Sequence, residues 1–138
     1  LLPGEPNSPI RGGVPKHKQI KTAPDILLQD GDAVGSLIAT AAPGHTPGLM
    51  AFYDTRSGAM LAGDAFQTRG GVAVSGQLVP WFPFPAWATW DKKTALETAK
   101  KLRAYNPTLL AVGHGELVKQ PGSILDQAIQ DAERNLKK

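Results

Sequence analysis

The sequence predicts an α/β fold in which a mixed, largely antiparallel sheet is covered by helices on one face. Short apolar runs separated by polar turns fill the first half of the 138-residue chain. The second half instead shows a helix pattern, a further apolar run and a second helix pattern. Strands followed by helices around a later strand are typical of a layered α/β domain. With 41% apolar residues, the chain can bury one core.

The chain is expected to divide into an irregular arm and one folded unit. Residues 1–24 are rich in proline and glycine and show no apolar period of two or 3.6, which is typical of irregular structure. His17 lies in this arm between Lys16 and Lys18 and is expected to be exposed to solvent. Residues 25–138 carry the apolar patterns and form the predicted domain.

Four strands are expected before residue 65. They cover residues 26–28, 37–42, 49–53 and 59–62. Asp30 and Asp32 lie in a turn at residues 29–32 that has a hairpin signal, and a polar turn follows at residues 54–58. The spacing of the last three strands fits an antiparallel meander.

Residues 65–90 are the least regular part of this domain and hold most of the aromatic residues. Two interpretations remain open for them. The stretch is either a loop that tucks its aromatic side chains into the core, or a lid or wall of a substrate pocket.

Two helices are expected around a strand at residues 109–112. The first begins at an N-cap formed by Thr89 or Asp91 and reaches Tyr105, and the second begins near Pro121. Their apolar stripes are Ala95, Leu96, Ala99 and Leu102 in the first, and Leu125, Ala128, Ile129, Ala132 and Leu136 in the second.

Composition excludes several classes of function. The net charge of +3 comes without a run of five like charges, so no nucleic-acid partner is expected. Cysteine is absent, which excludes disulfides, thiol catalysis and thiolate metal sites. No stretch of 18 apolar residues exists, so no membrane partner is expected. The first residues do not form a signal peptide, which favours a cytoplasmic location.

Three potential metal ligands follow apolar runs in the same way. His45, Asp64 and His114 each come directly after a glycine at the end of a predicted strand. Taken singly, each histidine could be a structural turn residue and Asp64 could cap a turn or helix. Together, two imidazoles and a carboxylate at strand ends make a plausible metal site for zinc, iron or manganese.

The phrases around these residues resemble the C-terminal half of the metallo-β-lactamase fold, an αββα sandwich. They are Leu-Gln-Asp-Gly-Asp at 28–32, Ala-Pro-Gly-His-Thr-Pro-Gly at 42–48, Leu-Ala-Gly-Asp at 61–64 and Val-Gly-His-Gly at 112–115. The resemblance covers residues 24–136. It implies that His45 binds one zinc ion, that His114 binds a second, and that Asp64 bridges the two and has the catalytic role of orienting the pair.

The same resemblance implies a metal-dependent hydrolase acting on a small-molecule substrate. A metal-bound hydroxide would attack an ester, lactone, thioester, amide or phosphoester. Part of the family uses a single iron ion to oxidise sulfur compounds, so a mononuclear iron sulfur dioxygenase is a further alternative. One iron ion per chain would indicate the dioxygenase, and two zinc ions would indicate the hydrolase.

The chain departs from the family in one large respect. The His-x-His-x-Asp-His phrase that supplies the other ligands is absent, and neither His-x-His nor Asp-His occurs anywhere. The sequence therefore predicts half a site and a sheet with one uncovered apolar face. Three explanations are open: a fragment whose missing N-terminal half covers the sheet, pairing with a second copy, or a non-catalytic binding module. The isolated chain is expected to be inactive, with two zinc ions in an intact parent or no metal in this chain alone.

Overall fold

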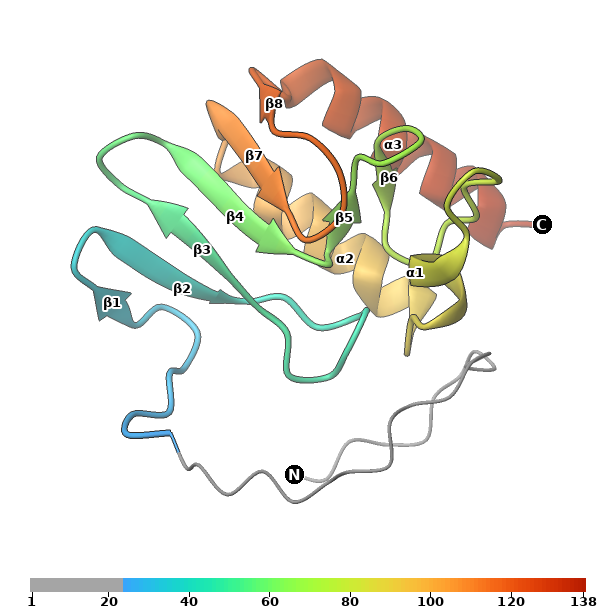
Figure 1. Ribbon diagram of the computed structural model, residues 1–138. Coiled ribbons are helices and arrows are strands. Elements are labelled where there is room, and N and C mark those ends of the chain that lie inside the picture. Colours follow the sequence, from blue (N-terminus) through green and yellow to red (C-terminus); the bar gives the residue numbers. More distant parts are fainter. Residues whose placement is uncertain (1–23) are drawn as a thin grey trace.

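The computed structural model describes residues 24–138, which form a six-stranded mixed sheet with two long helices on one face (Figure 1). The predicted fold class is therefore confirmed. The arm predicted over residues 1–24, including His17, lies outside the described residues except for Pro24. In spatial order the strands are β1 (Ala33–Val34), β2 (Leu37–Ala41), β3 (Met50–Asp54), β4 (Ala59–Gly63), β7 (Leu109–Val112) and β8 (Val118–Lys119).

The expected meander is present in β2, β3 and β4. Ala39 pairs with Phe52, and Phe52 also pairs with Leu61, both in antiparallel register. β7 then adds to β4 in parallel, with Leu61 opposite Ala111. A parallel neighbour needs a long crossover connection, and the segment between β4 and β7 supplies it with a helix packed on the sheet.

The strand expected at residues 26–28 is not formed. Ile26 and Leu27 are 76% and 79% exposed and belong to an irregular segment. The carboxylate of Asp30 accepts a hydrogen bond from the backbone N–H of Ala41 at 2.7 Å. In a sheet, this N–H group would pair with a neighbouring strand. The hairpin forms later, between β1 and β2, where Gly35 has a φ of +60° that suits a two-residue turn.

The stretch at residues 65–90 contains a small second sheet and a short helix. β5 (Phe66–Gln67) pairs with β6 (Ala73–Val74), and α1 (Phe84–Trp87) follows. Phe66 reaches the core, but Trp81 and Phe84 are 89% and 63% exposed. The interpretation that this loop tucks its aromatics into the core is therefore wrong for residues 81–87.

The two long helices are α2 (Lys92–Ala104) and α3 (Gly122–Leu136). Asp91, not Thr89, caps α2, because its carboxylate accepts a hydrogen bond from the backbone N–H of Thr94 at 2.8 Å. The predicted apolar stripe of α2 is buried throughout, and that of α3 is buried except for Leu136. Leu136 is the last residue of α3 and is 40% exposed.

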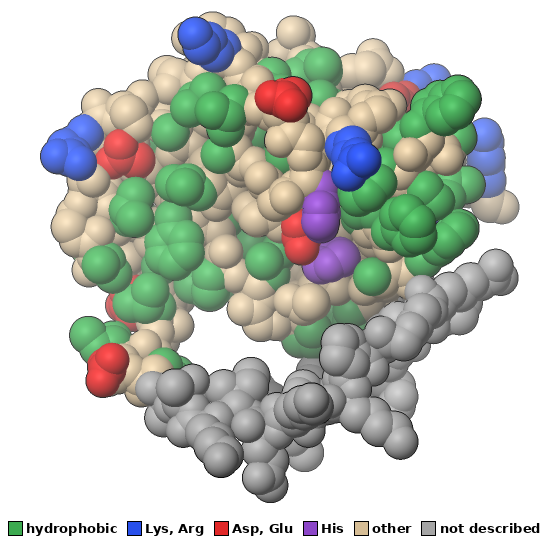
Figure 2. Space-filling model, in the orientation of Figure 1, with side chains coloured by type: hydrophobic (Ala, Val, Ile, Leu, Met, Phe, Trp, Pro, Cys, Tyr) green, Lys and Arg blue, Asp and Glu red, His purple; other side chains and the backbone are tan. Residues whose placement is uncertain are grey.

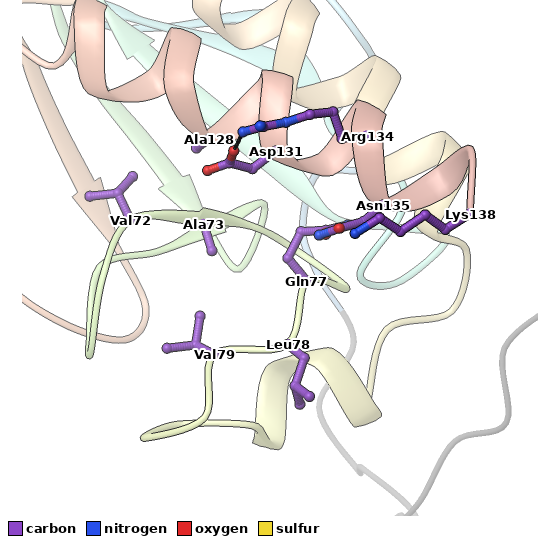
Figure 3. A pocket seen from close by; sticks show the side chains of 10 residues that line it. All are labelled: Val72, Ala73, Gln77, Leu78, Val79, Ala128, Asp131, Arg134, Asn135 and Lys138. Carbon is purple, nitrogen blue, oxygen red and sulfur yellow. Dashed lines mark hydrogen bonds and ion pairs between the residues drawn. The ribbon is translucent and has the colours of Figure 1, made fainter.

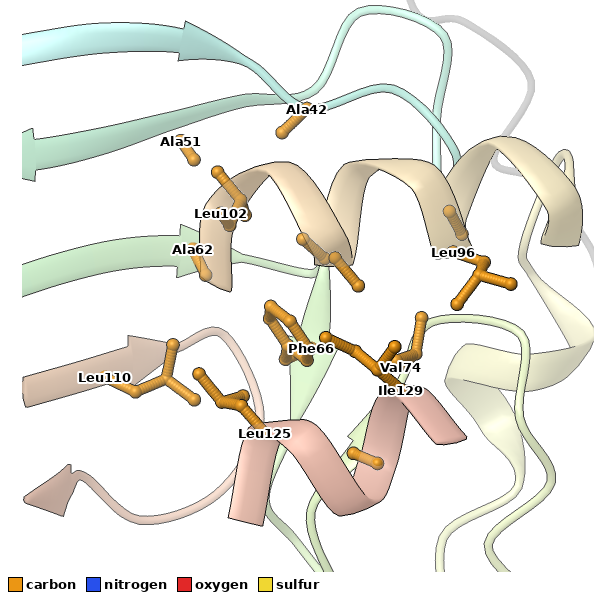
Figure 4. Close-up of a cluster of buried hydrophobic side chains, with 14 of the residues drawn as sticks. Ala42, Ala51, Ala62, Phe66, Val74, Leu96, Leu102, Leu110, Leu125 and Ile129 are labelled. Carbon is orange, nitrogen blue, oxygen red and sulfur yellow. The ribbon is translucent and has the colours of Figure 1, made fainter. Parts of the chain in front are cut away.

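The core lies between the helices and one face of the sheet (Figure 4). Sheet residues such as Met60 and Leu110 are fully buried against Leu102 of α2 and Leu125 of α3. Tyr53 packs its ring 5.0 Å from that of Tyr105, which follows α2. Among residues 24–138, no helix is both long and apolar enough to cross a membrane.

The opposite face of the sheet is not covered by any helix of the described chain. Leu61 is 43% exposed there, and its register neighbours Phe52 and Ala111 share the face. Figure 2 shows hydrophobic side chains spread over this face of the sheet. The expected uncovered apolar sheet face is thus present in the described part of the protein.

Candidate metal centre

The ends of three strands bring the predicted ligands together. β2, β4 and β7 all point the same way, because β3 runs antiparallel to both β2 and β4, and β7 runs parallel to β4. His45, Asp64 and His114 each follow the carboxyl end of one of these strands and so reach one edge of the sheet. Figure 2 shows the two histidines beside an acidic side chain at the surface.

Each oxygen of Asp64 faces a different imidazole. Oδ2 lies 3.6 Å from Nε2 of His45, and Oδ1 lies 3.5 Å from Nε2 of His114. These distances are longer than a charge-assisted hydrogen bond. They are close to the spacing of about 3.4 Å expected between two ligand atoms of one tetrahedral zinc ion.

The donor set fits part of a two-metal site. Asp64 offers one oxygen to each of two positions, and each position has one imidazole nitrogen. Within residues 24–138, no group of three or more His, Cys, Asp or Glu side chains is placed to hold one metal ion. Each of these two positions would therefore have two protein donors from the described chain, and a stable site needs more.

Glycine before each ligand permits a close approach of the backbone. A Cβ on Gly113 would collide with Oδ1 of Asp64, and one on Gly44 would collide with the backbone of Ala95 in α2. The backbone N–H of Gly113 also donates to the carbonyl of Gly63 at 3.0 Å, which ties the two turns together. A side chain at either position would displace a ligand-bearing turn.

We expect Gly44→Ala to disturb this edge of the sheet. The added methyl collides with the backbone of Ala95, and Gly44 has a φ of +139°, so the free energy of unfolding in urea should fall by about 1–3 kcal/mol. Gly48→Ala is the matched control, since a Cβ there meets nothing within 4 Å, and its effect should stay within about 0.5 kcal/mol. Equal effects of the two substitutions would contradict the close approach at Gly44.

A chain of buried hydroxyls holds the other side of the His45 ring. Nδ1 of His45 lies 3.1 Å from Oγ of Ser75 and 3.3 Å from Oγ1 of Thr89, and the two hydroxyl oxygens are 2.9 Å apart. The Thr89 hydroxyl donates to the carbonyl of Pro85 at 2.6 Å. Ser75 and Thr89 are 2% and 0% exposed.

The hydrogen count of these groups fixes the tautomer of His45. A carbonyl can only accept, so the single hydroxyl hydrogen of Thr89 is used on Pro85. The Ser75 hydroxyl must then donate to Thr89, and its oxygen is left to accept from His45. Nδ1 therefore carries the ring hydrogen, and Nε2 keeps a lone pair directed toward Asp64.

Electrostatics also favour a neutral His45. Burial lowers the pKa of His45 below its usual value; the Asp64 carboxylate opposes this shift and His114 adds to it. A neutral imidazole is the form that binds a metal.

Sequence reasoning missed the residues around the ligands. The sequence suggests Thr89 only as a helix cap and gives Ser75 no role, whereas both contact His45. On the other side, the ring of Phe82 lies 5.3 Å from that of His114. An isolated serine at the end of an apolar run was the available signal for Ser75.

One well-formed cavity of the protein, of about 350 Å³, lies away from these ligands (Figure 3). It sits between α3 and the segment that follows β6, and none of its lining residues is a predicted ligand. Four of its five polar lining side chains are already paired, Arg134 with Asp131 and Asn135 with Gln77. The cavity therefore does not extend the metal centre.

Comparisons with known proteins agree with this fold. YobT of Bacillus subtilis (strain 168), an uncharacterized protein, is 54% identical over 134 residues, which are 97% of this chain and 57% of YobT. YflN of the same organism, a probable metallo-hydrolase, is 31% identical over 107 residues, which are 73% of this chain and 40% of YflN. The chain thus spans roughly half the length of these curated relatives.

Solved structures show the same fold. The metallo-beta-lactamase family protein TTHA1429 from Thermus thermophilus is 24% identical with a TM-score of 0.59, over 80% of this chain and 36% of that one. TTHA1623, solved in a di-iron-bound form, is 26% identical with a TM-score of 0.55, over 74% of this chain and 46% of that one. The sequence pattern that defines the metallo-beta-lactamase superfamily matches residues 3–114 of this chain. The chain therefore belongs to the metallo-beta-lactamase superfamily.

Proposed function

We propose that this chain supplies one half of a two-metal hydrolase site. In this proposal His45 and His114 each hold one metal ion, and Asp64 bridges the two. The observation that carries it is the arrangement of Asp64, whose two oxygens face two different imidazoles at 3.6 and 3.5 Å. Superfamily membership suggests a metal-dependent hydrolase in general, which agrees with this role.

The proposed reaction is hydrolysis of an ester, lactone, thioester, amide or phosphoester in a small molecule. Bound metal ions supply Lewis-acid chemistry and activate water at neutral pH. The part played by the chain is to hold the two Nε2 atoms and the Asp64 carboxylate in fixed positions. Zinc is the proposed metal, although iron and manganese accept the same ligand types. Superfamily members bind metal ions, and TTHA1623 was solved in a di-iron-bound form.

The remaining ligands are proposed to come from polypeptide that covers the bare sheet face. Leu61 is 43% exposed at the centre of that face, which is unusual for a leucine in a central strand. An N-terminal half of a longer chain or a second copy could cover it. We therefore expect the 138-residue chain by itself to show no hydrolase activity.

A chimera with YobT tests this proposal. This chain would replace the matching 57% of YobT, so that the rest of YobT is free to supply the other ligands. The zinc content and the hydrolysis of a panel of esters, lactones, thioesters and phosphoesters are then measured. We expect two zinc ions per chimera and turnover on part of the panel, with both lost in Asp64→Ala.

Other outcomes separate the alternatives. Turnover by the zinc-loaded 138-residue chain, lost in Asp64→Ala, would contradict the half-site proposal. One iron ion per chimera with oxidation of a sulfur compound would indicate a dioxygenase. A folded chimera that binds no metal would indicate a non-catalytic binding module.

A further inference from the structure

We propose that Arg69 and the neighbouring aromatic row form a subsite for an oxyanion attached to an apolar group of the substrate. The aromatic row consists of Phe82, Phe84 and Trp87, and it begins at the ring of His114. This inference rests on the proposed function, because it places the substrate beside the metal centre. It adds the chemical class of the substrate, which the ligands alone do not define.

The backbone of Arg69 is fixed to the turn that carries His114. The backbone N–H groups of Thr68 and Arg69 both donate to the carbonyl of His114, at 2.9 and 3.2 Å. The Thr68 hydroxyl donates to the carbonyl of Glu116 at 2.7 Å. The two segments approach so closely that a Cβ on Gly115 would collide with both Thr68 and Arg69. Arg69 therefore has a defined position relative to the proposed metal ligand.

The guanidinium group of Arg69 is held on an aromatic face and has no acidic partner among the described residues. Its Cζ lies 4.8 Å from the centre of the Phe82 ring, which is itself 5.3 Å from the His114 ring. The other three arginines within residues 24–138 each pair with an aspartate, whereas Arg69 forms no ion pair in that range. An exposed, oriented guanidinium fork is suited to a carboxylate or phosphate group.

The aromatic row continues outward from this cation. Phe82 and Phe84 meet edge to face at 5.7 Å, and Phe84 and Trp87 do so at 5.8 Å. Phe84 and Trp87 are 63% and 39% exposed, and the adjacent Trp81 is 89% exposed. Figure 2 shows a hydrophobic patch beside the two histidines, with a basic side chain at the upper edge of both. Exposed aromatic surface next to a catalytic centre can bury an apolar substrate group.

The charge and the aromatic surface together define the substrate class. A ligand that places its oxyanion on Arg69 can lay an aromatic or aliphatic group along the aromatic row. Its scissile bond would then lie on the His114 side of Phe82. A neutral molecule would gain nothing from the Arg69 cation.

The test measures binding without metal or turnover. The 138-residue chain in EDTA is titrated with phenylacetate, phenyl phosphate and neutral phenylacetamide, and ¹H–¹⁵N spectra follow the indole N–H signals of Trp81 and Trp87. We expect one of the two anions to bind about tenfold more tightly than phenylacetamide. The comparison of phenylacetate with phenyl phosphate identifies which oxyanion is preferred.

Variants assign the effect to the two parts of the subsite. Arg69→Gln should abolish the preference for the anion, whereas Arg56→Gln, at an exposed arginine paired with Asp54, should leave it intact. Phe84→Ala should weaken the anions and phenylacetamide alike. Equal binding of anions and phenylacetamide by the unmodified chain, or no shift at Trp81 and Trp87, would overturn the proposal. Zinc binding is titrated separately. A failure of the half-site proposal and a failure of the subsite proposal therefore give different results.

Discussion

Asp64→Ala is expected to weaken metal binding at both positions, whereas His45→Ala should weaken only one. The reason is geometric, since Asp64 alone faces both imidazoles. Zinc is titrated into the chimera with YobT, in which the remaining ligands are proposed to be supplied, while NMR follows the assigned imidazole signals of His45 and His114. Loss of an outer-shell partner already costs about 10–100-fold in metal affinity, so loss of the Asp64 ligand should cost at least ~tenfold at each position.

A matched control separates ligation from charge. Glu116→Gln removes an exposed carboxylate two residues from His114 and should leave both affinities within about twofold. His45→Ala should leave the response of the His114 signals to zinc largely unchanged. If Asp64→Ala altered the response of only one histidine, Asp64 would serve one metal position and the bridging role would be wrong.

The parts of this protein that sequence could predict depend on contacts near in sequence or on regular periods. The stripe of α2, including Ala95, Ala99 and Leu102, follows from a 3.6-residue period and is buried as expected. Placing His45, Asp64 and His114 at one sheet edge required only that three strands run the same way. A glycine before each ligand indicated a tight turn, and the collision expected for a Cβ on Gly113 gives the physical reason.

The parts that sequence could not predict depend on pairs distant in the chain. Ser75 and Thr89 contact His45 across 30 and 44 residues, and no local pattern marks either hydroxyl. The residues at 26–28 look like a strand, but Asp30 bonds the backbone N–H of Ala41 instead. The aromatic side chains near residue 84 carry a strong core signal, and only the tertiary structure shows that Phe84 remains exposed.

Thr89→Val is expected to reverse the tautomer of His45 and thereby weaken zinc binding at that position. Valine has the shape of threonine but no hydroxyl, so the Ser75 hydroxyl loses its acceptor and turns to donate to Nδ1 of His45. The ring hydrogen then moves to Nε2, the atom that faces Asp64. Imidazole ¹⁵N shifts of the metal-free chain should report Nδ1–H in the unmodified protein and Nε2–H in the variant.

The size of this effect follows from the role of groups that orient metal ligands. Zinc affinity at the His45 position should fall by ~10–100-fold in Thr89→Val, and the His114 position should be unaffected. Thr89→Ser keeps the hydroxyl and should restore both the tautomer and the affinity. Thr40→Val is the control for loss of a buried hydroxyl, because Thr40 is 0% exposed and bonds Tyr105 instead. A loss of affinity in Thr89→Val without a change of tautomer would show that packing around Thr89, and not the direction of its hydrogen bonds, positions His45.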